Sequence, residues 1–149
     1  MRYMLDTDIC IYTINERPPA VLRAFREFQP AGLGVSSVTA AELFFGVART
    51  GSQRNLDGLR RFLATLEIAA FDAAAAEVCG SMRAWLASQG TPIGPYDTLI
   101  AAHAQALRVT LVSNNTREFD RVPGLRVENW ALEGEGTPRV RPGARRPRP

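Results

Sequence analysis

Short apolar runs alternate with longer segments of helical periodicity along most of the chain, and this alternation strongly narrows the folds open to it. Strands buried on both faces read as continuous apolar runs, and a helix between two of them supplies the crossover that parallel neighbours need. The pattern therefore predicts an α/β fold with a parallel sheet covered by helices on both faces. We expect strands at 2–5, 32–37, 67–71 and 109–113, and a weaker fifth strand at 125–130.

The segments between these strands carry helix start and stop signals. Pro18-Pro19 opens one segment and Pro95 another, while Gly51 and Gly90 stand where a glycine ends a helix. The predicted helices therefore cover 8–15, 20–28, 39–48, about 56–66, 73–88 and 95–107.

Length and cysteine content indicate how the fold is held together. A chain of 149 residues is large enough to bury a core as one domain without disulfides. Its two cysteines, Cys10 and Cys79, form neither a disulfide framework nor a zinc ligand pattern. No apolar run is long enough to span a membrane, and the first residues do not resemble a signal peptide. We therefore expect a cytoplasmic protein.

The net charge of +3 is unevenly distributed. Residues 134–149 hold five Arg and one Glu, whereas residues 1–133 carry 13 Arg against 14 acidic residues. The first 133 residues are therefore predicted to form the domain, followed by a disordered Arg/Pro-rich tail at 134–149. Any attraction of that tail to a polyanion would be non-specific and sensitive to salt.

Acidic residues follow several of the predicted strands. Asp6 and Asp8 follow the first strand, Glu42 lies in the first turn of the helix after the second, and Asp97 begins the helix before the fourth. Ligands of open parallel sheets bind at the carboxyl ends of the strands, where these acids would meet. Each acid also has a structural explanation: Asp6 or Asp8 could cap a helix, Thr39 and Glu42 fit a capping box, and Asp97 suits the helix dipole.

Apolar flanks favour a functional role for the acids as a group. Ionised carboxylates crowded among such residues repel one another and lose hydration, unless a cation or shared protons relieve them. Oxygen ligands suit a hard divalent cation. The pattern therefore predicts a Mg²⁺ site, with Mn²⁺ as an alternative metal.

A different chemistry would use Asp6 as a nucleophile. The stretch "DTDIC" resembles the opening motif of haloacid-dehalogenase-type phosphatases, with Cys10 where Thr or Val is usual. That family ordinarily needs a later Lys, but all 18 basic residues of this chain are Arg. RNA cleavage by a histidine pair is excluded, because His103 is the only histidine.

The motifs together resemble the PIN-domain ribonucleases of the VapC toxin type. The matching stretches are "MLDTDICIYTI", "SSVTAAELFFGV", "GTPIGPYDTLIAAHA" and "LVSNNTREFDRVPGLRVENW". The resemblance implies one PIN domain with a five-stranded parallel sheet, Mg²⁺-dependent endoribonuclease activity, and neutralisation by a small co-encoded antitoxin. It also implies that Asp6, Glu42 and Asp97 are the catalytic, metal-binding acids.

The chain departs from this family at two positions. Asp8 stands where many relatives have Asn, and Asn115 occupies the position of a fourth acid in many PIN domains. We include Asn115 among the catalytic candidates, although an amide brings no charge, and we take Asp8, Ser113 and Glu118 as secondary candidates. An inactive PIN fold that serves as an interaction module stays open as an alternative.

The resemblance also suggests a substrate and partners. Attack by water rather than by a ribose hydroxyl should leave a 5′-phosphate and a 3′-hydroxyl. We expect single-stranded or looped RNA, specifically a tRNA anticodon loop, with initiator tRNA as the first candidate. We also expect a homodimer and a complex with the antitoxin, which would direct a basic side chain at the acids. It would dock on partly exposed apolar residues of two helices: Val21, Leu22, Phe25, Phe28, Leu56, Leu59, Phe62 and Leu63.

Overall fold

Five short parallel strands form the sheet, in the order β3-β2-β1-β4-β5, in a computed structural model that describes residues 1–132. The strands are β1 (Tyr3–Leu5), β2 (Leu33–Ser36), β3 (Glu67–Ala69), β4 (Thr110–Val112) and β5 (Val127–Glu128). The predicted parallel α/β fold is therefore confirmed, and so is the weak fifth strand. The predicted tail at 134–149 lies outside the described residues.

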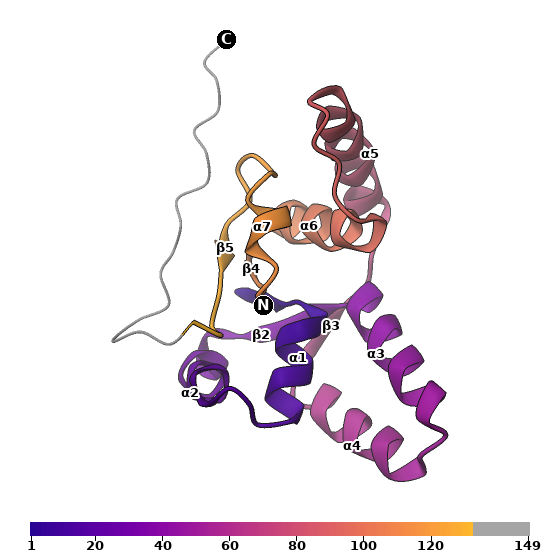
Figure 1. Cartoon of the computed structure of the whole chain (residues 1–149), viewed down its shortest axis with the longest axis vertical. Coiled ribbons are helices and arrows are strands. Elements are labelled where there is room, and N and C mark those ends of the chain that lie inside the picture. Colours follow the sequence, from indigo (N-terminus) through magenta and orange to yellow (C-terminus); the bar gives the residue numbers. More distant parts are fainter. Residues whose placement is uncertain (133–149) are drawn as a thin grey trace.

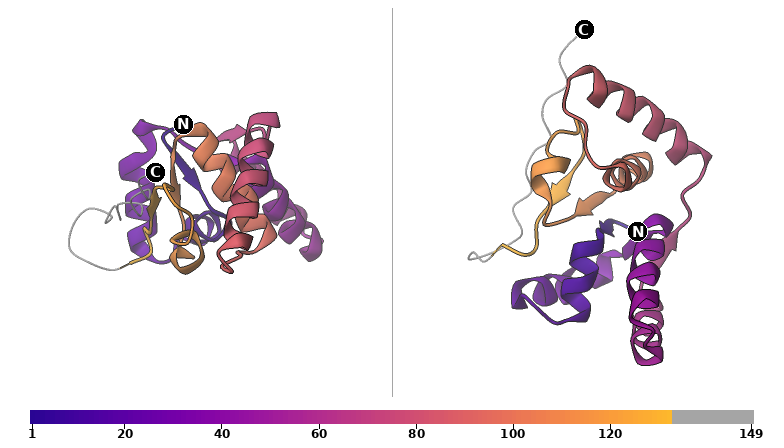
Figure 2. Two further views of the ribbon diagram at one scale, coloured as in Figure 1. Left: turned by 90° about the horizontal axis from the view of Figure 1, so that it is seen from above. Right: turned by 45° about the vertical axis from the view of Figure 1, so that its right-hand side comes forward.

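Helices cover both faces of this sheet (Figure 1). They are α1 (Thr7–Ile14), α2 (Pro19–Phe28), α3 (Ser37–Thr50), α4 (Gln53–Leu63), α5 (Ala73–Ser88), α6 (Pro95–Leu107) and α7 (Thr116–Phe119), with a 3₁₀ turn at Gln29–Ala31. The group α1 to α4 lies on one side of the sheet, while α6 lies on the other with α5 packed against it (Figure 2). The short α7 is absent from the sequence prediction. Within residues 1–132, no helix has the length and hydrophobicity needed to cross a bilayer.

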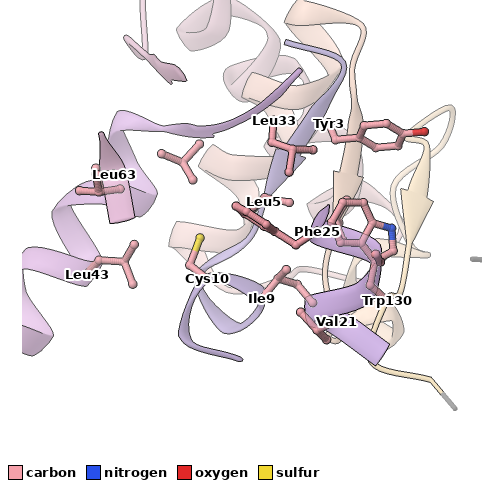
Figure 3. Close-up of a cluster of buried hydrophobic side chains, with 14 of the residues drawn as sticks. Tyr3, Leu5, Ile9, Cys10, Val21, Phe25, Leu33, Leu43, Leu63 and Trp130 are labelled. Atoms are coloured by element: carbon pink, nitrogen blue, oxygen red, sulfur yellow. The ribbon is translucent and has the colours of Figure 1, made fainter. Parts of the chain in front are cut away.

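Successive side chains along each strand point to opposite faces of the sheet, so the interior is divided into two cores. Tyr3 and Leu5 face α1 to α4, whereas Met4 between them faces α5 and α6. The first core, which we call the aromatic core, contains large side chains (Figure 3). Trp130 packs in this core, and its ring centroid lies 5.7 Å from that of Tyr3 and 5.3 Å from that of Phe28. The second, alanine-rich core includes three fully buried residues of α6: Ala101, Ala102 and Ala104.

The apolar residues expected to be partly exposed for a partner are mostly part of the fold. Four of the eight are buried, and the other four, Leu22, Phe28, Leu56 and Phe62, are only partly exposed. The sequence pattern identified the apolar side of each helix, but this side packs onto the aromatic core. The exposed large apolar residues of α1 and α3 are instead Ile11, Ile14, Phe44 and Phe45.

Candidate active site

The connection of the strands creates a switch point beside β1. The chain fills β1, β2 and β3 on one side and then crosses to β4 on the other side of β1. Open parallel sheets bind ligands at this type of position, at the carboxyl ends of the strands. Asp6 directly follows β1 and Ser113 directly follows β4, so the switch point brings these two residues together.

Asp6 is held firmly at this edge. Its backbone N–H donates to the Val112 carbonyl at 2.9 Å, and its Oδ1 accepts from the Thr7 N–H at 2.8 Å. The Ser113 hydroxyl donates to Asp6 Oδ2 at 2.7 Å, and Asp6 is only 5% exposed. Burial raises the pKa of Asp6, and the two hydrogen bonds to the carboxylate oppose that rise. Asp6 therefore begins α1 and presents a fixed carboxylate.

Asp8 points toward the loop between β4 and α7. Its Oδ2 accepts from the Asn114 N–H at 3.0 Å, and its Oδ1 accepts from the Ile9 N–H at 2.7 Å. Burial, together with the charge of Asp6, raises the pKa of Asp8 to about 6. Asp8 thus ties the start of α1 to the loop that carries Asn115.

Sequence reasoning missed a polar network around this loop. The Asn114 amide nitrogen donates to the Tyr12 hydroxyl at 3.2 Å, and Asn129 donates to Asn114 Oδ1 at 3.0 Å. The Ala131 N–H in turn donates to Asn129 Oδ1 at 2.9 Å. No local sequence motif identifies Tyr12 or Asn129 as part of the site. Asn114 could have been found, because it is next to the candidate Asn115. The network joins α1, the β4–α7 loop and the segment after β5.

Glu42 lies in the second turn of α3, because that helix begins earlier than predicted. The N-cap is Ser36, whose hydroxyl accepts from the Val38 N–H at 3.1 Å. The capping-box alternative for Thr39 and Glu42 is therefore excluded, since Thr39 is buried inside the helix and its hydroxyl has no hydrogen-bond partner among residues 1–132. Glu42 therefore does not have the helix-capping role that the sequence had suggested for it.

The Glu42 carboxylate is only partly satisfied. Among the described residues, Glu42 Oε1 is buried without a hydrogen-bond partner, and so is the Thr7 hydroxyl. The Thr7 hydroxyl is close enough to lower the pKa of Glu42, but burial and the charge of Asp6 outweigh it and raise that pKa. A buried carboxylate oxygen without a partner is costly, so this atom is suited to a ligand.

Asp97, Asn115 and Glu118 form a second group at the same edge. Asp97 occupies the first turn of α6, and Asn115 Nδ2 donates to Asp97 Oδ2 at 3.1 Å and to Glu118 Oε2 at 3.3 Å. Burial, the adjoining Glu118 carboxyl and the charges of Asp6 and Glu42 raise the pKa of Asp97 to about 8. Hydrogen bonding to Asp97 lowers the pKa of Glu118. The pair therefore shares one proton, held mainly by Asp97.

Ser113 links the two halves of the site. While its hydroxyl donates to Asp6, the same oxygen accepts from the Asn115 N–H at 2.9 Å. Asn115 thus positions its amide over Asp97 and Glu118, and it offers donors rather than an oxygen to the centre of the site. Of the two residues considered for the position of the fourth acid, Glu118 supplies the carboxylate.

The structure brings the predicted acids to one edge without closing them around a common point. The charge of Asp6 raises the pKa values of Glu42 and Asp97, so these acids are near one another. Among residues 1–132, however, no three His, Cys, Asp or Glu side chains are arranged as a metal-binding group. Asp6 and Asp97 accept hydrogen bonds from Ser113 and Asn115. The donor set, including the unpartnered Glu42 Oε1, fits a hard cation that would draw these side chains together.

The structure gives no support for the phosphatase alternative at Cys10. The Cys10 side chain is fully buried in the aromatic core, and burial raises the pKa of its thiol well above the usual value. The second aspartate of that motif, Asp8, binds the Asn114 backbone. Cys10 therefore packs in the core, and Asp8 is held by the loop between β4 and α7.

Comparison with known proteins agrees with this arrangement. The PIN domain family model matches residues 3–125. The tRNA(fMet)-specific endonuclease VapC of Shigella flexneri is 44% identical over 132 residues, which cover 88% of this chain and 99% of that protein. Two crystal structures have a TM-score of 0.80: VapBC2 from Rickettsia felis bound to a promoter DNA fragment, and DNA-bound VapBC from Salmonella typhimurium. The matched VapC chains are 40% and 41% identical, with coverage of 87% of this chain and 99% and 98% of theirs. The chain therefore belongs to the PIN-domain family and, within it, to the VapC ribonucleases of toxin–antitoxin systems.

Proposed function

We propose that this chain is a toxin endoribonuclease that cleaves initiator tRNA in its anticodon loop. The observation that carries the catalytic assignment is the meeting of Asp6, Glu42 and Asp97 at the switch point, close enough for their charges to interact. Relatives from Shigella flexneri and Salmonella typhimurium, 44% and 40% identical, are named tRNA(fMet)-specific endonucleases, which supports the substrate. An anticodon loop offers unpaired nucleotides whose backbone can enter a compact acidic site.

Asp6, Glu42 and Asp97 would hold Mg²⁺ or Mn²⁺, and Glu118 would add a fourth carboxylate. Bound there, the ion would polarise a phosphate oxygen and lower the pKa of the attacking water. Before both can act as anionic ligands, Asp97 and Glu118 must release the proton that they share. Ser113 and Asn115 would keep the neighbouring carboxylates in place while RNA binds.

Nucleotide-resolution mapping of tRNA cleavage tests this function. The protein should cut initiator tRNA within the anticodon loop and leave a 5′-phosphate, and EDTA should stop the reaction. Glu42→Gln should lose nearly all activity and keep its thermal stability, because Glu42 does not cap α3. Cleavage that persists in EDTA would contradict the metal, and cuts spread over all tRNAs would contradict the substrate. Wild-type activity of Glu42→Gln would contradict the site.

A groove between α1, α3 and α4 is where we propose that a small antitoxin binds. Its volume is about 800 Å³, and Thr7 and Glu42 lie at the end nearest the acids. Ile11, Ile14 and Phe62 line it, so its walls suit an apolar peptide segment. The partner would direct a basic side chain toward the acids, where it would compete with the metal. The groove includes Leu59 and Phe62 of the eight residues expected to dock a partner, whereas the expected residues of α2 do not line it.

Glycine substitutions test the groove directly. Gly46 of α3 lines it, and a Cβ built at this position meets no atom within 4 Å. A Gly46→Gln side chain should fill part of the groove and weaken antitoxin binding. Gly80→Gln is the matched control, because Gly80 is also an unobstructed glycine within a helix but lies outside the groove. Inhibition curves are compared after each variant is normalised to its own cleavage rate. Equal inhibition of both variants would exclude this docking site.

We also propose that the protein forms a homodimer. Phe45 on α3 and Trp85 on α5 are 63% and 42% exposed, which would be disfavoured if these surfaces remained in water. Light scattering during size-exclusion chromatography should give twice the chain mass, and Phe45→Ser with Trp85→Ser should lower it. A monomeric wild-type protein would contradict this proposal.

A further inference from the structure

His103 is a buried polar residue that the acidic site does not use. It lies on α6, six residues beyond Asp97, and is only 1% exposed. Its Nδ1 is 2.8 Å from the Ser36 hydroxyl oxygen, and 67 residues separate the two positions. This buried hydrogen bond links the helix that carries Asp97 to the start of the helix that carries Glu42.

The donor and acceptor roles follow from the neighbouring groups. Ser36 Oγ accepts from the Val38 N–H and keeps a hydrogen of its own, so we assign this hydroxyl as the donor to His103 Nδ1. This assignment leaves the ring proton on Nε2, and a hydrogen bond to the Ala70 backbone favours the protonated ring. Burial lowers the pKa of His103, although the charge of Asp72 and the bond to Ala70 oppose this, so the ring is neutral.

The surroundings of the imidazole keep it in one orientation. The Phe71 ring meets it edge to face, with centroids 5.4 Å apart and an interplanar angle of 75°. The Phe71 N–H donates to the Ser37 hydroxyl at 3.0 Å. From its place on α6, His103 therefore contacts both the end of β2 and the segment after β3.

We propose that the His103–Ser36 hydrogen bond is a cross-brace that fixes the separation of Glu42 and Asp97. His103 and Ser36 are thus positioning residues for the acidic site. Glu42 is six residues beyond Ser36 on α3, and Asp97 is six residues before His103 on α6. Each acid is therefore about 9 Å from the brace along its own helix. At this distance a small change in the angle between α3 and α6 displaces the carboxylates, so loss of the brace weakens their shared hold on a cation.

Three variants test the brace, which rests on the proposed metal-dependent cleavage. Ser36→Ala removes the donor, and His103→Phe keeps a planar ring against Phe71 but loses both hydrogen bonds. Ser52→Ala is the control, because Ser52 caps α4 by accepting from the Asn55 N–H at 3.2 Å but does not contact α6. Comparing the two serine variants separates loss of a helix cap from loss of the brace.

The readouts are Mn²⁺ affinity by calorimetry without RNA, the kcat and KM of cleavage, and the melting temperature. Ser36→Ala and His103→Phe should each weaken Mn²⁺ binding and lower kcat by about tenfold or more, with KM nearly unchanged. Ser52→Ala should have a lower melting temperature but normal Mn²⁺ affinity and kcat. Folded brace variants with wild-type Mn²⁺ affinity and kcat would overturn the proposal.

The ring itself supplies a readout independent of activity. In the wild-type protein, ¹⁵N shifts should report an unprotonated Nδ1 and a protonated Nε2, and Ser36→Ala should move the Nδ1 signal. An Nδ1 signal that does not respond to Ser36→Ala would overturn the brace. If wild-type protein neither binds Mn²⁺ nor cleaves RNA while this shift occurs, the proposed function fails and the hydrogen bond stands without a catalytic role, which also overturns the positioning proposal.

Discussion

The two faces of the sheet are covered in different ways. On one face, α6 presents alanines such as Ala101 and Ala102 to the sheet, and both are fully buried. On the other face, large side chains such as Phe25 and Trp130 fill the aromatic core, and a groove of about 800 Å³ remains between α1, α3 and α4. The small residues of α6 let this helix pack closely on the sheet, which holds Asp97 in place. Helix α3 instead borders the groove, and Glu42 is one of the residues that line it. Close packing where α6 meets the sheet therefore fixes the site, while the hollow on that side, of about 760 Å³, lies between α5 and residues 122–123. The grooved face gives access to the site.

Replacing an acid on the close-packed face should have the largest effect. Asp97→Asn should lower cleavage by more than about 100-fold, because loss of a ligand should cost more than loss of a supporting residue. Its melting temperature should not fall near neutral pH, because the amide replaces a carboxyl whose pKa of about 8 already keeps it mostly uncharged. Glu77→Gln is the control for a carboxyl-to-amide change at an exposed position of α5. Cleavage assays and thermal melts measure both effects, and a folded, fully active Asp97→Asn would remove Asp97 from the site.

Enlarging a side chain should distinguish the two faces by stability. Ala102→Leu should destabilise the protein by about 1–3 kcal/mol, because the added methyl groups enter a fully packed core. Val47→Leu should cost much less, because Val47 is half-buried and faces the groove. Urea unfolding gives both values. Equal losses would show that the groove is packed as tightly as the α6 face, contrary to the comparison.

The pH dependence of stability should sharpen the comparison further. A carboxyl whose pKa is raised on folding binds more protons in the folded state, so its contribution to stability falls as pH rises from its unfolded pKa to its folded pKa. The pKa values of Asp8 and Asp97 rise to about 6 and about 8, so metal-free protein should lose stability between about pH 4 and pH 8. Asp97→Asn should flatten the upper part of this decline. Urea titrations in EDTA measure it, and a wild-type protein that gains stability over this range would contradict the shifts.

The smallest expected effect is a gain on the grooved face. Gly46→Ala should stabilise the protein by about 0.5–1 kcal/mol, because Gly46 lies within α3 and a Cβ there meets nothing within 4 Å. Gly80→Ala in α5 should give a similar gain, since its surroundings are equally open. A loss of stability at Gly46 alone would mean that the groove closes over this position in solution.

Most of the architecture was predictable from local sequence. Apolar runs with helical segments between them indicated the parallel sheet, and acids after the strands indicated the edge where Asp6, Glu42 and Asp97 meet. These inferences hold because periodicity and chain direction already determine which end of a strand each residue occupies. The start of α3 was predicted wrongly because Thr39 fits a capping motif as well as Ser36 does, and only Ser36 is positioned to bond the Val38 N–H.

The sequence by itself determined which residues could do the chemistry, and the tertiary structure decided how they are combined. Glu118 beside Asp97, Asn114 on Asp8, and His103 on Ser36 each join positions far apart in the chain. No spacing rule connects such pairs, because their contact depends on the strand order and on how closely each helix packs. The exposure of the apolar residues was also decided by packing. The apolar sides of α2 and α4 were evident from the sequence, but only the structure showed that most of these residues pack in the core and that α4 borders a groove together with α1 and α3.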